Sequence, residues 1–192
     1  KIINRYTVPE IFLKKNKSKI VSLSCYTAQF AKIADNHADI ILVGDSMGMV
    51  IYGQKNTLSV TKEMMIEHGK AVVNSTKKAL VVIDLPFGSY ENSKKRAFKV
   101  SSEILSKTGA SAVKLEGGIE LADTIKFLVD RGIPVMGHIG LMPQRINIKG
   151  KFISQGHSSL EVKKIITDAK SISSAGVFSI VVEAVKESLG KK

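Results

Sequence analysis

The chain has 192 residues, enough for one hydrophobic core, and no apolar run approaches the roughly 18 residues that a membrane span requires. Its net charge of +12 is the balance of 29 basic and 17 acidic residues; only four of the basic residues are arginine, and tryptophan is absent. This composition favours a lysine-rich surface over nucleic-acid binding, which relies on guanidinium forks and aromatic stacking. The single cysteine, Cys25, excludes an internal disulfide framework and is typical of a reducing compartment, so we expect a cytoplasmic protein.

Short apolar runs rich in β-branched residues recur along the chain and predict buried parallel strands. In chain order they cover residues 19–26, 38–45, 79–87, 112–118, 134–140 and 178–185. Longer stretches between them have helical spacing, at residues 61–78, 93–110, 119–133 and 159–177. Thr61 is the expected N-cap of the first of these helices, and Gly109 the expected end of the second.

The alternation of strands and helices predicts an α/β fold with right-handed parallel crossovers. Residues 1–192 show no linker or low-complexity segment, so we expect a single domain. An open doubly wound sheet and a TIM-type (β/α)8 barrel both fit the element order. The barrel is favoured because polar residues fall at the C-terminal ends of different strands, where barrel enzymes carry their chemistry. Closure normally takes eight strands, so a barrel would be truncated after about six.

The run "AVKLEGG" at 112–118 places two charges at the end of a strand. Side chains alternate along a strand, so Lys114 and Glu116 share one face. The same counting brings four carboxylates to one mouth of the barrel against one lysine and one histidine. Such a cluster requires a cation or shifted pKa values. The predicted members are Asp45, Asp84, Lys114, Glu116, His138 and Glu183.

Oxygen ligands indicate a hard metal, and a small number of protein ligands indicates Mg²⁺, which keeps water and binds substrate oxygens. Asp45 and Asp84 are the best candidates, because each ends a strand before a turn. The sequence has no zinc signature, no P-loop and no GxGxxG motif.

Each of these residues also has a purely structural interpretation. A strand-end Asp can cap the next turn, and Lys114 with Glu116 can form a structural ion pair. His138 can be a hydrogen-bonded core histidine, whereas Glu183 lies in the most apolar segment, where a buried Glu without a function is improbable. Cys25 is expected to pack as a small apolar residue. The remaining histidines are expected at the surface: His37, His68 and His157.

Several ordered segments resemble the ketopantoate hydroxymethyltransferase (3-methyl-2-oxobutanoate hydroxymethyltransferase) family over about residues 20–185. They are "LVGDSMGMVIYG", "TLSVT", "DLPFGSY", "VKLEGG", "GHIGLMPQ" and "SIVVEAV". The resemblance implies a barrel of the phosphoenolpyruvate mutase and isocitrate lyase type, assembled as a homo-oligomer that is a decamer in the family. It implies transfer of a hydroxymethyl group from 5,10-methylenetetrahydrofolate to 3-methyl-2-oxobutanoate through a Mg²⁺-stabilised enolate. The product is 2-dehydropantoate, in pantothenate and coenzyme A biosynthesis.

The resemblance also implies a role for each matching residue. Asp45 and Asp84 are similar to the Mg²⁺ ligands, and Asp84 also to a substrate contact. Ser46 is similar to a contact with the keto-acid carboxylate. The remaining roles are as follows: Glu116 resembles a carboxylate that holds metal-bound water, Lys114 and His138 resemble keto-acid-binding groups, and Glu183 resembles the catalytic proton-transfer residue. We expect Glu183 to have a raised pKa in its apolar strand.

The chain departs from the family pattern in several places. Thr27 follows Tyr26 where many members have Asp, Ser59 stands where Pro is common, and Lys186 stands at another usual Pro. The first ten residues have neither an apolar leader nor an initiating Met, so we expect the natural chain to begin earlier. The family continues past residue 185 with two more strands, which we expect to be missing here. Two alternatives therefore stay open: a truncated non-catalytic remnant, or a related Mg²⁺-dependent lyase of 2-oxo acids.

Overall fold

The computed structural model describes residues 5–191 and contains strands where the apolar runs predict them. Residues 1–4, the start of the segment expected to lack a leader, and Lys192 lie outside the described part of the chain. Each strand is shorter than its apolar run, because the run also includes residues that flank the strand. The described strands are β1 (Ser22–Ser24), β2 (Ile40–Val43), β3 (Leu80–Asp84), β4 (Ala112–Glu116), β5 (Val135–Gly140) and β6 (Ser179–Glu183).

Helices follow the strands in the predicted alternation. Thr61 caps the helix that follows it by accepting a hydrogen bond from the Met64 N–H at 3.2 Å, and Gly109 ends another helix in the left-handed conformation (φ 74°). The α-helices are α1 (Val8–Leu13), α2 (Ala28–Ala34), α3 (Met47–Val50), α4 (Lys62–Ser75), α5 (Lys94–Thr108), α6 (Ala122–Val129), α7 (Ile146–Lys149), α8 (Ser159–Ser174) and α9 (Glu187–Gly190), with 3-10 turns η1 (Ile119–Leu121) and η2 (Pro143–Arg145).

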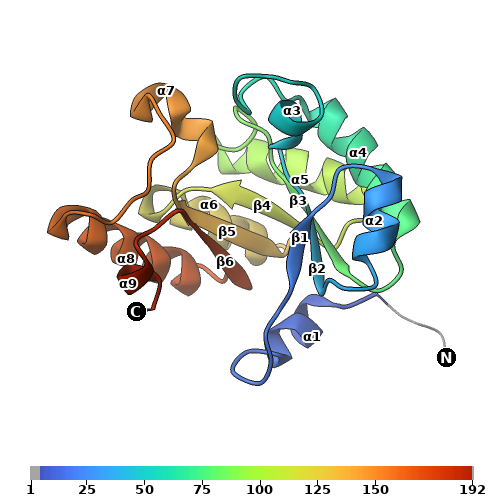
Figure 1. The fold of residues 1–192 in the computed structure, drawn as a ribbon, viewed down its shortest axis with the longest axis horizontal. Helices are drawn as coiled ribbons and strands as arrows, with labels where there is room; N and C mark the ends of the chain where they lie inside the picture. Colours follow the sequence, from blue (N-terminus) through green and yellow to red (C-terminus); the bar gives the residue numbers. More distant parts are fainter. Residues whose placement is uncertain (1–4, 192) are drawn as a thin grey trace. The chain divides into compact units, whose positions relative to one another are not determined.

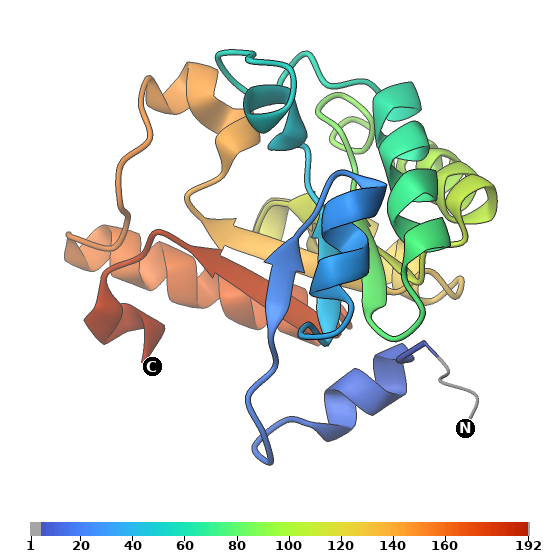
Figure 2. The same ribbon diagram turned by 45° about the vertical axis from the view of Figure 1, so that its right-hand side comes forward.

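The described chain forms two compact units, the first ending at Val113 and the second beginning at Lys114. In the first unit the strand order is β1-β2-β3, and both pairings are parallel. Helix α4 packs between α2 and α5, so these three helices lie side by side along the strands (Figures 1 and 2). The single domain expected over residues 1–192 stays a prediction.

The turn before β3 is held by a carboxylate from the end of α2. Asp35 accepts backbone N–H bonds from Lys77 at 2.8 Å, Lys78 at 3.0 Å and Ala79 at 2.8 Å. The Arg5 guanidinium donates to the Ala79 carbonyl at 2.8 Å. The backbone groups of residues 77–79 named here are therefore hydrogen-bonded to side chains, and these bonds fix where β3 begins.

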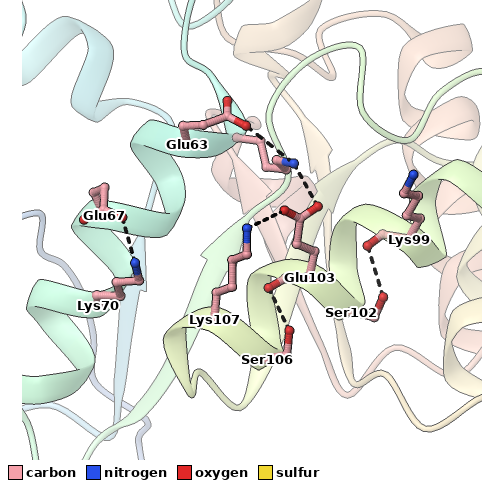
Figure 3. Close-up of polar contacts among 9 residues, drawn as sticks. Glu63, Glu67, Lys70, Lys99, Ser102, Glu103, Ser106 and Lys107 are labelled. Atoms are coloured by element: carbon pink, nitrogen blue, oxygen red, sulfur yellow. Dashed lines mark hydrogen bonds and ion pairs between the residues drawn. The ribbon is translucent and has the colours of Figure 1, made fainter.

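An ion-pair bridge joins α4 to α5 on their outer surface. The Glu103 carboxylate accepts hydrogen bonds from Lys62 and from Lys107, each at 2.8 Å (Figure 3). These two bonds lower the pKa of Glu103 to about 2. A separate pair within α4, Glu67 with Lys70, lies nearby on the same helix surface at 2.8 Å (Figure 3).

In the second unit the order is β4-β5-β6, and β5 pairs with β6 in parallel, with His138 opposite Val181. Helix α8 packs along β5 and β6 (Figures 1 and 2). Asp168 of α8 is buried and accepts the Ile119 N–H at 3.1 Å. This bond anchors the Gly117–Gly118 turn at the end of β4.

Burial differs between the strands. Every residue of β3 and β4 is buried, as the continuous apolar runs predict for strands covered on both faces. The prediction was wrong for β1, which is exposed, and for β6, where Val182 is 44% exposed. In the described chain β1 and β6 are the first and last strands of the order, so β1 has only β2 as a neighbour and β6 only β5. No described helix combines the length and apolar character needed to cross a bilayer.

Candidate active site

Two of the predicted metal ligands lie together at the C-terminal ends of β2 and β3. Asp84 is the last residue of β3, and Asp45 follows β2 after Gly44; both are only 3% exposed. The Asp84 Oδ2 atom accepts the backbone N–H of Asp45 at 3.0 Å. The structure therefore brings Asp45 and Asp84 together, as the sequence predicts.

Gly44, between β2 and Asp45, lies close to both Ser46 and Asp84. A Cβ atom there would lie 2.8 Å from Ser46 Oγ and 3.4 Å from Asp84 Oδ2. Two buried carboxylates at the ends of neighbouring strands supply the hard oxygen ligands that Mg²⁺ prefers, with few protein ligands. Between residues 5 and 191 no group of three His, Cys, Asp or Glu side chains is arranged to hold a metal. The residues thus fit a Mg²⁺ ion that keeps several water ligands or takes substrate oxygens.

Ser46 is the N-cap residue of the short helix α3, yet its hydroxyl makes no capping bond. The hydroxyl instead lies 2.8 Å from the Tyr26 hydroxyl. Tyr26 was not among the predicted site residues, although it closes the first apolar run and could have been found as a strand-end polar group.

The second unit holds the remaining predicted residues in one connected group. Lys114 Nζ lies 3.2 Å from His138 Nδ1, and His138 Nε2 lies 3.3 Å from Glu183 Oε2. Lys114 and His138 are 3% and 2% exposed. The two ring nitrogens of His138 thus face different partners, Nδ1 towards Lys114 and Nε2 towards Glu183. The three side chains therefore form a connected chain from β4 through β5 to β6.

Glu116 is buried beside this chain. Its Oε1 atom lies 3.6 Å from His138 Nδ1, and its Oε2 atom accepts the backbone N–H of Gln144 at 3.0 Å. Lys114 and Glu116 thus share one face of β4, as strand alternation predicts. Gln144 was not predicted as a site residue, because it contacts Glu116 through its backbone N–H, which every residue except proline has.

The environment of Glu183 differs from the expectation. Its side chain is 41% exposed rather than buried, and its pKa is lowered rather than raised. Hydrogen bonding from His138 is the largest cause of the lowered pKa, and burial opposes it. The raised pKa was predicted from the apolar neighbours in "SIVVEAV". It was wrong because the effect of His138, on β5, is larger than the effect of burial.

Two further expectations concern residues outside this group. Cys25 is 4% exposed and burial raises the pKa of its thiol, so it packs as a small apolar residue. His37 and His157 are exposed as expected, and His68 is only partly exposed. His68 is half-buried and contacts the Tyr26 carbonyl and the Tyr52 hydroxyl.

Solved structures define the class of fold. The chain is similar to phosphonopyruvate hydrolase in complex with oxalate and Mg²⁺ (TM-score 0.69, 12% identity, covering 93% of this chain and 64% of that one). It is also similar to 2,3-dimethylmalate lyase, a PEP mutase/isocitrate lyase superfamily member (TM-score 0.68, 12% identity, 96% and 64%). The fold is the TIM-type (β/α) barrel of this superfamily, which confirms the predicted class, and the described chain carries six of its strands.

Sequence comparison gives the family. The sequence model described as ketopantoate hydroxymethyltransferase matches residues 5–192. A 3-methyl-2-oxobutanoate hydroxymethyltransferase of Rhizobium etli is 52% identical over 188 residues (98% of this chain, 69% of the relative), and one of Bartonella tribocorum is 54% identical over 192 residues (100% and 71%). The chain belongs to the ketopantoate hydroxymethyltransferase family.

Proposed function

We propose that the protein transfers a hydroxymethyl group from 5,10-methylenetetrahydrofolate to 3-methyl-2-oxobutanoate, giving 2-dehydropantoate for pantothenate biosynthesis. In this reaction C3 of the keto acid loses a proton and forms a bond to the methylene carbon, water supplies the hydroxyl group, and tetrahydrofolate leaves. Family membership supports the reaction. The observation that carries the proposal is the connected chain of Lys114, His138 and Glu183.

In the proposed mechanism Glu183 removes the C3 proton. Its lowered pKa keeps the carboxylate ionised and ready to accept a proton at neutral pH. His138, whose Nε2 faces Glu183, orients the carboxylate. The ammonium of Lys114 offsets the negative charge that develops on the substrate oxygen when the proton leaves.

The proposed metal ligands are Asp45 and Asp84, with Glu116 contributing through water. Mg²⁺ bound there would polarise the 2-oxo group and acidify the neighbouring C–H bond. Ser46 donates its hydroxyl proton to the substrate carboxylate, and Asp84 also contacts the substrate. The similar structure of phosphonopyruvate hydrolase is a complex with oxalate and Mg²⁺, which supports this choice of metal.

The co-substrate, assembly and location are also proposals. We infer that 5,10-methylenetetrahydrofolate is the one-carbon donor, that the protein forms a homo-oligomer, and that it acts in the cytoplasm. The family resemblance supports the first two, and the single reduced Cys25 supports the third. Light scattering on the purified protein gives the oligomeric state.

The test is exchange of the C3 proton of 3-methyl-2-oxobutanoate for deuterium, with Mg²⁺ and without folate. We expect exchange by the wild type and a loss of about 10²–10⁴-fold in Glu183→Gln, because general-base catalysis contributes about this factor. Glu187→Gln is the matched control, since Glu187 is exposed and pairs with Lys191. Normal exchange by Glu183→Gln would refute the assignment of the base, and no exchange by the wild type would favour a non-catalytic remnant.

A further inference from the structure

A hydrogen-bonded network in the first unit connects Ser46 to helix α4. The Ser46 hydroxyl lies 2.8 Å from the Tyr26 hydroxyl, and the Tyr26 carbonyl oxygen lies 2.6 Å from Nδ1 of His68. The other ring nitrogen of His68, Nε2, lies 2.8 Å from the Tyr52 hydroxyl. The rings of Tyr52 and His68 meet edge to face, with centroids 5.7 Å apart. The network thus joins the segments that follow β1 and β2 to α4.

The direction of each bond in this network follows from its acceptors. A backbone carbonyl can only accept, so Nδ1 of His68 carries a proton and donates it to Tyr26. In the neutral ring Nε2 is then an acceptor, and the Tyr52 hydroxyl donates to it. His68 therefore holds the backbone of Tyr26, while Tyr52 fixes the orientation of the imidazole ring.

We propose that His68 and Tyr26 are positioning residues for Ser46, and that they set the affinity of the site for the carboxylate of the keto acid. This inference rests on the proposed function, in which the Ser46 hydroxyl donates to that carboxylate. When Ser46 donates its single proton to the substrate, its oxygen is left as an acceptor. The Tyr26 hydroxyl then donates to Ser46 at 2.8 Å and holds the serine in the orientation that meets the substrate.

The position of Tyr26 depends on His68 because, within residues 5–191, the pairing of β1 with β2 stops short of the Tyr26 carbonyl. The ladder between β1 and β2 continues through the Cys25 N–H, which donates to Leu42 at 3.0 Å, and Tyr26 follows it in the turn before α2. The half-buried His68 supplies the hydrogen-bond donor for the Tyr26 carbonyl instead. Loss of the imidazole would leave that carbonyl without its partner and allow the turn to shift.

The test measures deuterium exchange kinetics with 3-methyl-2-oxobutanoate. We expect Tyr26→Phe and His68→Phe each to raise KM by about tenfold with kcat changed by less than about threefold, because the loss lies in binding the carboxylate. His68→Asn should stay within about threefold of the wild-type KM, since an Asn amide nitrogen can replace Nδ1 as donor. His37→Phe, at an exposed histidine, is the matched control.

Nitrogen-15 NMR of the four histidines gives a readout that does not depend on activity. We expect the neutral His68 ring to be protonated on Nδ1, with the resonance assigned by its absence from His68→Asn. Protonation on Nε2 would overturn the network, and so would an unchanged KM in both Phe variants, or a fall in kcat alone. Failure of the proposed function is distinct, because the wild type itself would then exchange no deuterium.

Discussion

The Nε2 atom of His138 lies 3.3 Å from the carboxylate of Glu183, across the pairing of β5 with β6. This contact is the largest cause of the lowered pKa of Glu183. A base acts only when it is ionised, so the lowered pKa extends its activity to lower pH. Removing His138 should raise the pKa of Glu183 towards its ordinary value.

We therefore expect His138→Asn to move the acid limb of the pH–exchange profile to higher pH, whatever the change in maximal rate. Carbon-13 NMR titration of the Glu183 carboxyl group checks the same shift without catalysis. A limb that stays in place or moves to lower pH would show that His138 does not control this pKa.

The pairing of Asp84 with the Asp45 backbone gives a test of the metal site. We expect Asp45→Asn and Asp84→Asn each to weaken Mn²⁺ binding, used as a probe for Mg²⁺, by about tenfold or more, because each removes a charged oxygen ligand. Electron paramagnetic resonance of free Mn²⁺ measures the affinity. Asp123→Asn is the control, since Asp123 is exposed in the first turn of α6. Equal affinity in all three variants would exclude this site.

Gly140 ends β5 with φ 89°, and a Cβ atom there would overlap the Glu183 carbonyl oxygen. Gly150 also has positive φ, at 74°, but a Cβ there meets nothing within 4 Å. We expect Gly150→Ala to lower the free energy of unfolding by about 1–2 kcal/mol through backbone strain alone. Gly140→Ala should cost about 2–4 kcal/mol because strain and steric overlap combine. Urea denaturation compares the two, and equal losses would contradict the close approach of β6.

Asp35 accepts three consecutive backbone N–H groups ahead of β3. We expect Asp35→Ala to lower the free energy of unfolding by about 1–3 kcal/mol, because partly buried donors lose a charged acceptor. Asp130→Ala is the control: Asp130 forms an exposed i,i+4 pair with Lys126, and its loss should cost less than about 1 kcal/mol. Similar denaturation midpoints for the two variants would show that the turn does not depend on Asp35.

The bridge from Glu103 to Lys62 and Lys107 predicts a pH-dependent stability. The pKa of Glu103 falls from 4.5 to about 2 in the folded protein, so its contribution is present above the unfolded pKa and is lost as pH falls towards 2. The difference in thermal midpoint between wild type and Glu103→Gln should therefore shrink from pH 5 to pH 2. Glu67→Gln, which removes a single exposed pair, should show a smaller difference. A difference that is constant with pH would contradict the bridge.

Much of the fold followed from local patterns. The continuous apolar run of β3 predicted a strand buried on both faces, because successive side chains point to opposite faces of the sheet and all of them are apolar up to Asp84. Thr61 and Gly109 marked helix ends, because capping and positive φ are properties of single residues. The exposure of β1 was missed, since it depends on how many neighbours a strand has.

Part of the candidate site could also be predicted from local patterns, and part of it could not. Strand alternation placed Lys114 beside Glu116 on one face, and the ends of β2 and β3 placed Asp45 near Asp84. The lowered pKa of Glu183 could not be predicted, because its cause comes from another strand.

The sequence by itself determined the order of the elements, the family, and which residue types stand at the strand ends, because these depend on periodicity and on ordered motifs. Only the tertiary structure decided which atoms meet: His68 with the Tyr26 carbonyl, and the Gln144 N–H with Glu116. Hydrogen bonding acts over about 3 Å between residues far apart in the chain, and no local pattern specifies such distances.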